Sequence, residues 1–364
     1  MDSRYENVQN FINQMTEENK FSGVVYCKLD DVAGDGLKMA TGYSDYSKTE
    51  KITLDSQFNI GSIGKTFTGQ MIMQLVESGT YDLDTIVNTL LPTSQKGGIS
   101  QQPKNAERIT VKELLDHSAH MGNYKALVAD WKKIFPDQGY RNLTFNTVYA
   151  ISCIMDPLQY TDGQNASYSN SGFIVLGEIL AHNYGKSYNE VIQQQIFDKS
   201  GYEMSNTTMN KSDAPNRVLG YKNPDFDPNK KNEDPDWNNF ETDASDYDRA
   251  YSDGGLITTL ADMITYSGAL FDAQYVSQDY LDTMFQAYTD PHSEGENDYG
   301  LAIEVKSTDY GKVIGHGGNT PYFDAAMYRY VDKKATIIIL ANIGGILSDY
   351  SWNIKGKVEE LLFA

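Results

Sequence analysis

The chain has 364 residues, of which 40% are hydrophobic, and this length predicts about two domains with large buried cores. Its 50 acidic residues outnumber the 30 basic ones, which gives a formal net charge of −20. Such a charge repels phosphate backbones and anionic lipids, so we expect nucleic acid and membrane surfaces to be poor partners. The simplest explanation of the acidity is solubility.

Cysteine usage and apolar runs also limit the class of protein. Cys27 and Cys153 both lie in apolar stretches, which predicts buried, inert thiols and no disulfide framework. No apolar run approaches the roughly 20 residues of a membrane span. The first twenty residues are polar and lack the apolar core of a leader peptide. We expect a cytoplasmic protein if Met1 is the native start, and an exported one if a leader was removed.

The first eighty residues predict a helix, a β-hairpin and a second helix. Apolar residues at helical spacing indicate the first helix, namely Val8, Phe11, Ile12 and Met15. Residues 21–29 and 37–43 read as strands joined by a glycine turn. The second helix begins near Ser62 and ends at Gly79.

The middle of the chain, from about residue 83 to 206, predicts mostly helices, with candidates at 111–117, 131–134 and 172–183. Thr110 is the expected N-cap of the first of these. Residues 222–248 are rich in Asn, Asp and Pro and predict a long loop, which is often functional in compact domains. Some tyrosines of the 220–251 region are candidates for lining a cleft.

Strand signals return near the end of the chain, where short segments are rich in β-branched and aromatic residues. These segments are 299–305, 312–315, 325–330 and 336–341. A closing helix has the inward-facing residues Trp352, Val358, Leu361 and Leu362. The sequence therefore predicts an α/β (α+β) fold with an antiparallel sheet flanked by helices, formed by residues 1–80 and 245–364, and a mostly helical domain inserted at residues 81–244.

The first chemical signal is Ser62-Ile63-Gly64-Lys65. Residues three apart share one helix face, so the Lys65 amine can reach the Ser62 hydroxyl. A serine hydroxyl is a weak nucleophile until a neighbouring base takes its proton. The alternative is an N-capping serine followed by a surface lysine. The spacing occurs at no other serine of the chain.

Two further segments carry candidate site residues. Tyr168-Ser169-Asn170 precedes an apolar helix, which suits a loop that presents side chains to a cleft, although a polar turn with a helix cap is the alternative. His316-Gly317-Gly318-Asn319 lies among strand signals, and its small residues would let a substrate lie against a strand backbone. A hairpin turn is the alternative for that segment.

The order and spacing of the three segments resemble the S-x-x-K, Y-x-N and K/H-x-G motifs of the serine β-lactamase and penicillin-binding family. The branch that this chain resembles most holds class C β-lactamases, D-alanyl-D-alanine carboxypeptidases, D-aminopeptidases and esterases. Further segments are similar to the family's sequence, namely residues 111–118, 79–84, 252–256 with 261–262, and 340–342. The resemblance covers roughly residues 20 to 345.

The resemblance implies a β-lactamase/transpeptidase-like fold and a role for each motif residue. Ser62 would be acylated, and Lys65 and Tyr168 would share its proton and pass it to the leaving group. Asn170 would hydrogen-bond the substrate amide and Lys65. The backbone N–H groups of Ser62 and Asn319 would form the oxyanion hole, beside the substrate-binding His316, Gly317 and Gly318. A lysine cation nearby predicts a lowered pKa for Tyr168.

The residue at the motif's lysine position is His316, whose usual pKa predicts partial charge at neutral pH and a weaker hold on a substrate carboxylate. That departure favours the D-peptidase and esterase branches over efficient β-lactamases. We expect turnover to depend on the charge of His316, between about pH 5.5 and 8, only for substrates that carry a carboxylate.

The sequence predicts no metal and no organic cofactor. His117 and His120 are spaced as metal ligands can be, but no supporting ligand set accompanies them, so a structural role is expected. The expected partner is a small-molecule or peptide substrate, such as a D-amino-acid amide, a D-amino-acid peptide or a β-lactam, and the oligomeric state is left open. Two alternatives are a carboxylesterase or acyltransferase on the same fold, and a non-catalytic penicillin-binding or sensor protein.

Overall fold

The computed structural model describes residues 2–45, 47–92, 102–127, 144–158, 164–222, 241–242, 251–292, 298–347 and 353–364. Its helices are α1 (Ser3–Glu17), α2 (Gly64–Glu77), α3 (Val111–Leu115), α5 (Phe145–Ile154), α6 (Asn170–Tyr184), α7 (Tyr188–Ile192), α8 (Leu260–Phe271), α9 (Gln278–Met284) and α10 (Ile354–Phe363). A short 3-10 turn, η1 (Gly61–Ile63), leads directly into α2.

Six strands form the main sheet, in the order β2-β1-β10-β9-β8-β7, and every neighbouring pair is antiparallel. They are β1 (Gly23–Leu29), β2 (Leu37–Thr41), β7 (Glu304–Thr308), β8 (Gly311–Asn319), β9 (Asp324–Tyr330) and β10 (Ala335–Ala341). Two-residue strands form two further pairs, β3 (Phe58–Asn59) with β6 (Ile257–Thr258) and β4 (Tyr221–Lys222) with β5 (Glu241–Thr242). The predicted fold, an antiparallel sheet flanked by helices, is confirmed.

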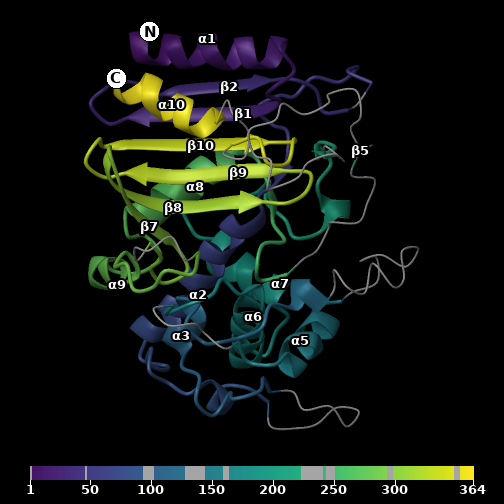
Figure 1. The fold of residues 1–364 in the computed structure, drawn as a ribbon, viewed down its shortest axis with the longest axis vertical. Helices are drawn as coiled ribbons and strands as arrows, with labels where there is room; N and C mark the ends of the chain where they lie inside the picture. The colour runs from purple at the N-terminus through teal and green to yellow at the C-terminus, as the bar shows by residue number, and fades with distance from the viewer. Residues whose placement is uncertain are drawn as a thin grey trace.

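Both faces of the sheet are buried because alternate side chains of a strand point to opposite sides. On β10, Ile337 and Ile339 belong to the apolar cluster that includes residues of α1 and α10. Ile338 and Leu340 belong to the cluster that includes residues of α2 and α8. Figure 1 shows α10 in front of the sheet, α8 behind it, α1 at the top next to β2, and α3, α5 and α6 in the lower half of the molecule.

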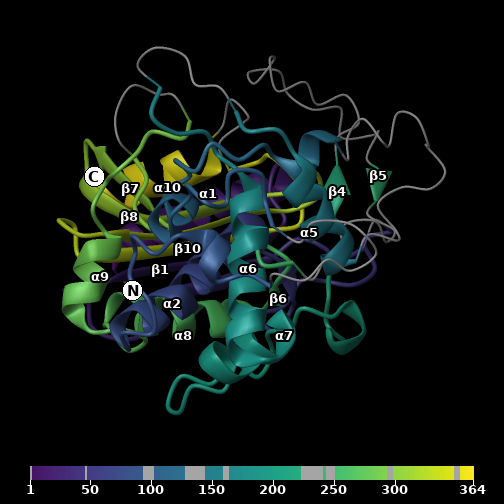
Figure 2. The same cartoon turned by 90° about the horizontal axis from the view of Figure 1, so that it is seen from below.

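The helices that carry the candidate site residues meet below the sheet. Helix α2 packs against α6, and the two lie side by side when the molecule is seen from below (Figure 2). The predicted capping of α3 by Thr110 is present as a full capping box with Glu113. Both cysteines are free and buried, as expected. Within the described residues, no helix is both long and apolar enough to cross a membrane.

One predicted strand is wrong in its placement. The sequence predicted a strand at residues 299–305, but β7 begins only at Glu304. The apolar run before it forms a buried loop instead, in which Ala302 has a positive φ of 62° and its side chain packs at Gly69 of α2. Tyr299 makes isolated β-bridges to Thr289 and Glu304, but the run joins no continuous strand and its side chains are buried in the core, so their composition misled the prediction.

Some predictions fall outside the described residues. These are the helix candidate at 131–134, Trp352, and most of the long loop at 222–248 with its candidate cleft-lining tyrosines. The division into a domain of residues 1–80 and 245–364 and an inserted domain of residues 81–244 stays a prediction.

Strand β8 passes the η1 turn at very short range, and glycine makes this approach possible. A Cβ added at Gly318 would lie 1.9 Å from the carbonyl oxygen of Ile60, just before η1. The segment before β6 also lies very close to η1, since Gly254 packs against the backbone carbonyl of Gly61. The start of α2 is therefore held between two backbone segments that are distant in the sequence.

We predict that Gly318→Ala lowers the free energy of unfolding by about 1–3 kcal/mol, because the backbone atom that a methyl group would meet cannot rotate away. Gly268→Ala on α8 is the matched control, since an added Cβ there meets no atom within 4 Å and should stabilise the helix by about 1 kcal/mol. Denaturant unfolding of both variants measures the difference. Equal stability of the two variants would contradict the close approach.

Candidate active site

Ser62 lies in the middle of η1, at the point where the chain enters α2. Ile60 and Ile63 on either side are fully buried, whereas Ser62 is partly exposed and lines a cavity of about 380 Å³. The hydroxyl is thus presented to the cavity by a turn whose flanking side chains are fixed in the core.

Lys65 lies one turn further along α2 and is completely buried. Its Nζ lies 3.0 Å from Ser62 Oγ, 2.8 Å from Asn170 Oδ1 and 2.7 Å from the backbone carbonyl oxygen of Asp253. Burial lowers the pKa of Lys65 to about 7, although the carboxylate of Asp253 opposes the shift. A substantial fraction of Lys65 is therefore a neutral amine at neutral pH.

The three partners of Lys65 restrict what a neutral amine can do. The amide oxygen of Asn170 and the carbonyl oxygen of Asp253 accept hydrogen bonds only, so they engage two N–H groups of the amine. Ser62 is the one partner that can also donate. The lone pair of a neutral Lys65 is thus directed to the proton of the Ser62 hydroxyl, which is the arrangement of a general base and a nucleophile.

Tyr168 lies in the loop before α6 and lines the same cavity as Ser62. Its ring is half-buried and packs on His117, with ring centroids 4.2 Å apart, and on Tyr299. Lys65 Nζ lies 5.0 Å from the centroid of the Tyr168 ring. Burial raises the pKa of Tyr168 far above its usual value, while the Ser62 hydrogen bond opposes the shift. The expectation of a lowered pKa was wrong, because desolvation outweighs the nearby amine.

Asn170 is the first residue of α6, so the two helices hold the pair Lys65–Asn170 together. The Asn170 side-chain amide is oriented by Asn123, 3.4 Å away. Below Tyr168, His117 accepts a hydrogen bond from the backbone N–H of Ser169, 3.2 Å away. His117 thus supports the loop that carries Tyr168, which fits the expected structural role.

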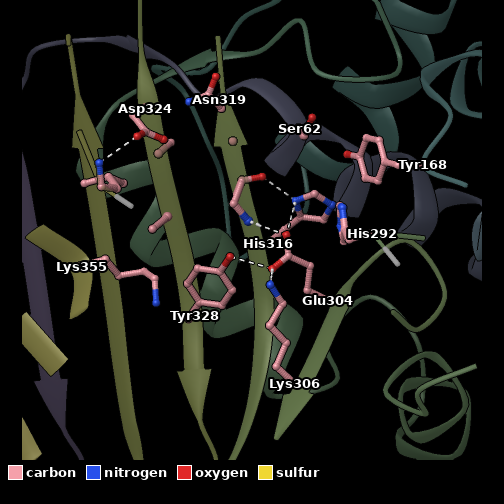
Figure 3. A pocket seen from close by; sticks show the side chains of 15 residues that line it. Ser62, Tyr168, His292, Glu304, Lys306, His316, Asn319, Asp324, Tyr328 and Lys355 are labelled. Atoms are coloured by element: carbon pink, nitrogen blue, oxygen red, sulfur yellow. Dashed lines mark hydrogen bonds and ion pairs between the residues drawn. The ribbon is translucent and has the colours of Figure 1, made fainter. Parts of the chain in front are cut away.

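The segment from His316 to Asn319 is the end of β8 and forms the opposite wall of the cavity (Figure 3). Ser62, Tyr168, Gly317, Gly318 and Asn319 all line this cavity. The structure therefore brings the three sequence segments to one place, although the alternative for the third was a hairpin turn.

His316 is buried and differs from what the sequence suggested. Its Nδ1 lies 2.5 Å from the Gly317 carbonyl oxygen, so Nδ1–H is the donor, and Nε2 lies 2.9 Å from the hydroxyl of Tyr299. Burial lowers the pKa of His316 to about 4, and the charge of Glu304 only partly opposes this. The expected partial charge at neutral pH was wrong, because the imidazole is desolvated and its two nitrogens are satisfied in the neutral form.

Sequence reasoning missed three residues that shape this site. Asp253 provides the carbonyl acceptor for Lys65, Tyr299 holds His316, and the buried Glu304 lines the cavity. Asp253 lies in the segment 252–256, whose similarity to the family could have identified it as a site residue. Glu304 lies near the end of the segment that the sequence predicted as a strand. Nothing in the sequence indicates that its side chain lies beside His316. Among the described residues, no group of three or more His, Cys, Asp or Glu is positioned to hold a metal ion.

An antiparallel sheet with a serine and a lysine one helical turn apart defines a class of active-site-serine hydrolases. The family profile described as Beta-lactamase matches residues 8–351. The chain therefore belongs to the beta-lactamase family and is a serine hydrolase, which confirms the resemblance seen in the sequence.

Individual relatives are distant. The chain is 25% identical to penicillin-binding protein 4* of Bacillus subtilis (strain 168), over 99% of this chain and 76% of the relative. It is 22% identical to a D-aminopeptidase of Cereibacter sphaeroides (strain ATCC 17029 / ATH 2.4.9), over 85% of this chain, and it spans only 55% of that relative's length. The fold is similar to that of D-amino acid amidase from Ochrobactrum anthropi SV3 in complex with D-phenylalanine, with a TM-score of 0.76, 20% identity, and coverage of 100% and 99% of the two chains.

We predict that the reactivity of Ser62 rises with pH through about 7, because only neutral Lys65 can accept the proton of its hydroxyl. Asn170→Asp places a carboxylate 2.8 Å from Nζ and should raise the pKa of Lys65 by about 1–3 units. The rate at which Ser62 reacts with an uncharged fluorophosphonate, followed over a pH series, gives the pH midpoint of the wild type and of the variant. Asn183→Asp, at the exposed end of α6, is the charge-matched control. If the pH midpoint of the Ser62 reaction is the same in Asn170→Asp as in wild type, Lys65 is not the base.

Proposed function

We propose that the protein hydrolyses amide or ester bonds of small acyl compounds through an acyl-enzyme on Ser62. The single observation that carries this proposal is the buried Lys65, whose amine is held 3.0 Å from Ser62 Oγ by two partners that can only accept. Neutral Lys65 takes the proton of Ser62 as the serine oxygen bonds to the carbonyl carbon. The backbone N–H groups of Ser62 and Asn319 receive the developing oxyanion, and loss of one such donor costs about 10²–10³ in rate.

Tyr168 completes the proposed cycle as an acid. Because burial keeps its phenol protonated, it can give its proton to the leaving nitrogen or oxygen when the carbonyl–leaving group bond breaks. The Lys65 ammonium then gives a proton to Tyr168, so both groups return to their starting forms and the net result is transfer of the Ser62 proton to the leaving group. In the second half, water attacks the ester carbonyl of Ser62 while the amine of Lys65 takes a proton from the water. Lys65 returns that proton to Ser62 Oγ as the acyl–oxygen bond breaks, which releases the acid product and restores the free serine.

The proposed substrates are D-amino-acid amides, D-amino-acid peptides or small esters. Support comes from the names of the relatives, which include a D-aminopeptidase and, for the fold, a D-amino acid amidase. The penicillin-binding relative supports acylation by β-lactams as a side reaction of the same serine. A carboxylesterase or acyltransferase would use the same residues, and these alternatives are separated by substrate and not by geometry.

We predict that an uncharged fluorophosphonate adds its mass to the wild-type protein and that Ser62→Ala abolishes this adduct. Intact-mass measurement detects the adduct, and Ser118→Ala, which replaces a serine outside the cavity lining, serves as the control. A panel of D-alanine amide, D-alanyl-D-alanine and p-nitrophenyl acetate then ranks the substrates. Turnover of the ester alone would favour the carboxylesterase. The absence of both adduct and turnover would favour a non-catalytic binding protein.

A further inference from the structure

The pairing of β8 with β7 ends before the strand reaches Ser62. The last pair is Glu304 opposite Gly315, so β8 has an edge from His316 to Asn319 with which no strand of the described residues pairs. In an antiparallel strand, the N–H and C=O of one residue point to the same side, and residues two apart point alike. Gly317 and Asn319 therefore direct their backbone groups to this edge, toward the site.

The first position on the open edge is already occupied by side chains of the protein. The N–H of Gly317 donates to Glu304 Oε1 at 3.3 Å, and its carbonyl accepts from His316 Nδ1 at 2.5 Å. A substrate backbone can therefore pair with Asn319 but not with Gly317.

Glu304 is the residue that fills this position, and its carboxylate is surrounded by donors. Besides Gly317 N–H, it accepts from the Tyr328 hydroxyl at 2.8 Å and pairs with Lys306 Nζ at 3.2 Å (Figure 3). His316 Nδ1 lies 3.6 Å from Glu304 Oε1, the same oxygen that accepts from Gly317. Burial raises the pKa of Glu304, whereas the charges of His316 and Lys306 and the hydrogen bonds from Tyr328 and Gly317 lower it. Because His316 is neutral at neutral pH, the ion pair with Lys306 and the two hydrogen bonds are what favour the carboxylate form there.

A backbone N–H, a hydroxyl and a lysine that converge from neighbouring strands are the groups that bind a carboxylate ligand. All of them line the same cavity as Ser62, and here they bind a carboxylate of the chain itself. The other lysine of the cavity wall, Lys355 on α10, is paired with Glu359 at 2.7 Å. Both lysines in the described wall of the cavity are therefore already paired with acidic side chains of the protein.

We propose that Glu304 is a specificity-determining residue that permanently occupies the anion-binding position of the cleft. Its negative charge excludes substrates with a free carboxylate beside the scissile bond and selects neutral amides and esters. This inference rests on the proposed function of Ser62. It narrows the substrate class to D-amino-acid amides and esters, and it predicts poor use of β-lactams and of peptides with a free C-terminal carboxylate.

The direct test uses two substrates that share one scissile bond and differ in one charge, D-alanyl-D-alanine and its C-terminal amide. We expect wild type to favour the amide, and Glu304→Gln to raise the ratio of kcat/KM for the acid over that for the amide by about tenfold or more, because like charges no longer face each other. Glu360→Gln, on the exposed side of α10, removes the same charge outside the cavity and should leave the ratio unchanged. An unchanged ratio in Glu304→Gln, with the amide still hydrolysed, would overturn the inference and leave the proposed function intact.

A second test does not depend on turnover. Glu304→Ala frees the donors, so acetate should raise its melting temperature while the neutral isostere acetamide should not, and wild type should respond to neither. If the alanine variant does not fold, wild type still provides a test, because acetate must fail to slow the labelling of Ser62. An equal response of both proteins to acetate, or acetate protection of wild-type Ser62, would contradict the occupied anion site. Loss of every Ser62-dependent reaction would instead overturn the proposed function.

Discussion

The chemistry of this site depends on one desolvated amine. Lys65 is fully buried beside Ser62. Its amine donates hydrogen bonds to an amide oxygen from α6 and to a backbone carbonyl oxygen from the segment before β6, which offset the loss of contact with water. Burial disfavours the charged form of Lys65 more than the nearby Asp253 carboxylate favours it, whereas the hydrogen-bond acceptors keep the amine in place. The result is a base near neutral pH that cannot turn away from the serine.

The rest of the fold can be understood as the support for that amine. Helix α2 carries both Ser62 and Lys65, and the glycines at 254 and 318 let two backbone segments close on the turn that starts it. Helix α6 supplies Asn170 and the loop with Tyr168, which rests on His117. The end of β8 forms the last wall, where neutral His316 and ionised Glu304 set the polarity of the cleft. The site thus combines a neutral histidine with an internal anion, which favours uncharged substrates.

Much of this arrangement could be predicted from local patterns. The spacing of Ser62 and Lys65 depends only on helix geometry, and the cap at Thr110 follows from its own side chain. The pKa directions of Tyr168 and His316 could not be predicted, because they depend on how much water the folded chain excludes around each ring. Glu304 was missed for a related reason: its partners come from β8 and β9, and the sequence does not give the register of those strands.

The most direct measurement of the central claim is the titration of Lys65 itself, by NMR of protein labelled with ¹³C at the lysine side chains. We predict one lysine resonance that titrates near pH 7, far below the usual lysine pKa of about 10.4, and that is lost in Lys65→Met. If the resonance assigned to Lys65 titrates near that usual value instead, the amine is charged at rest and cannot be the base that activates Ser62.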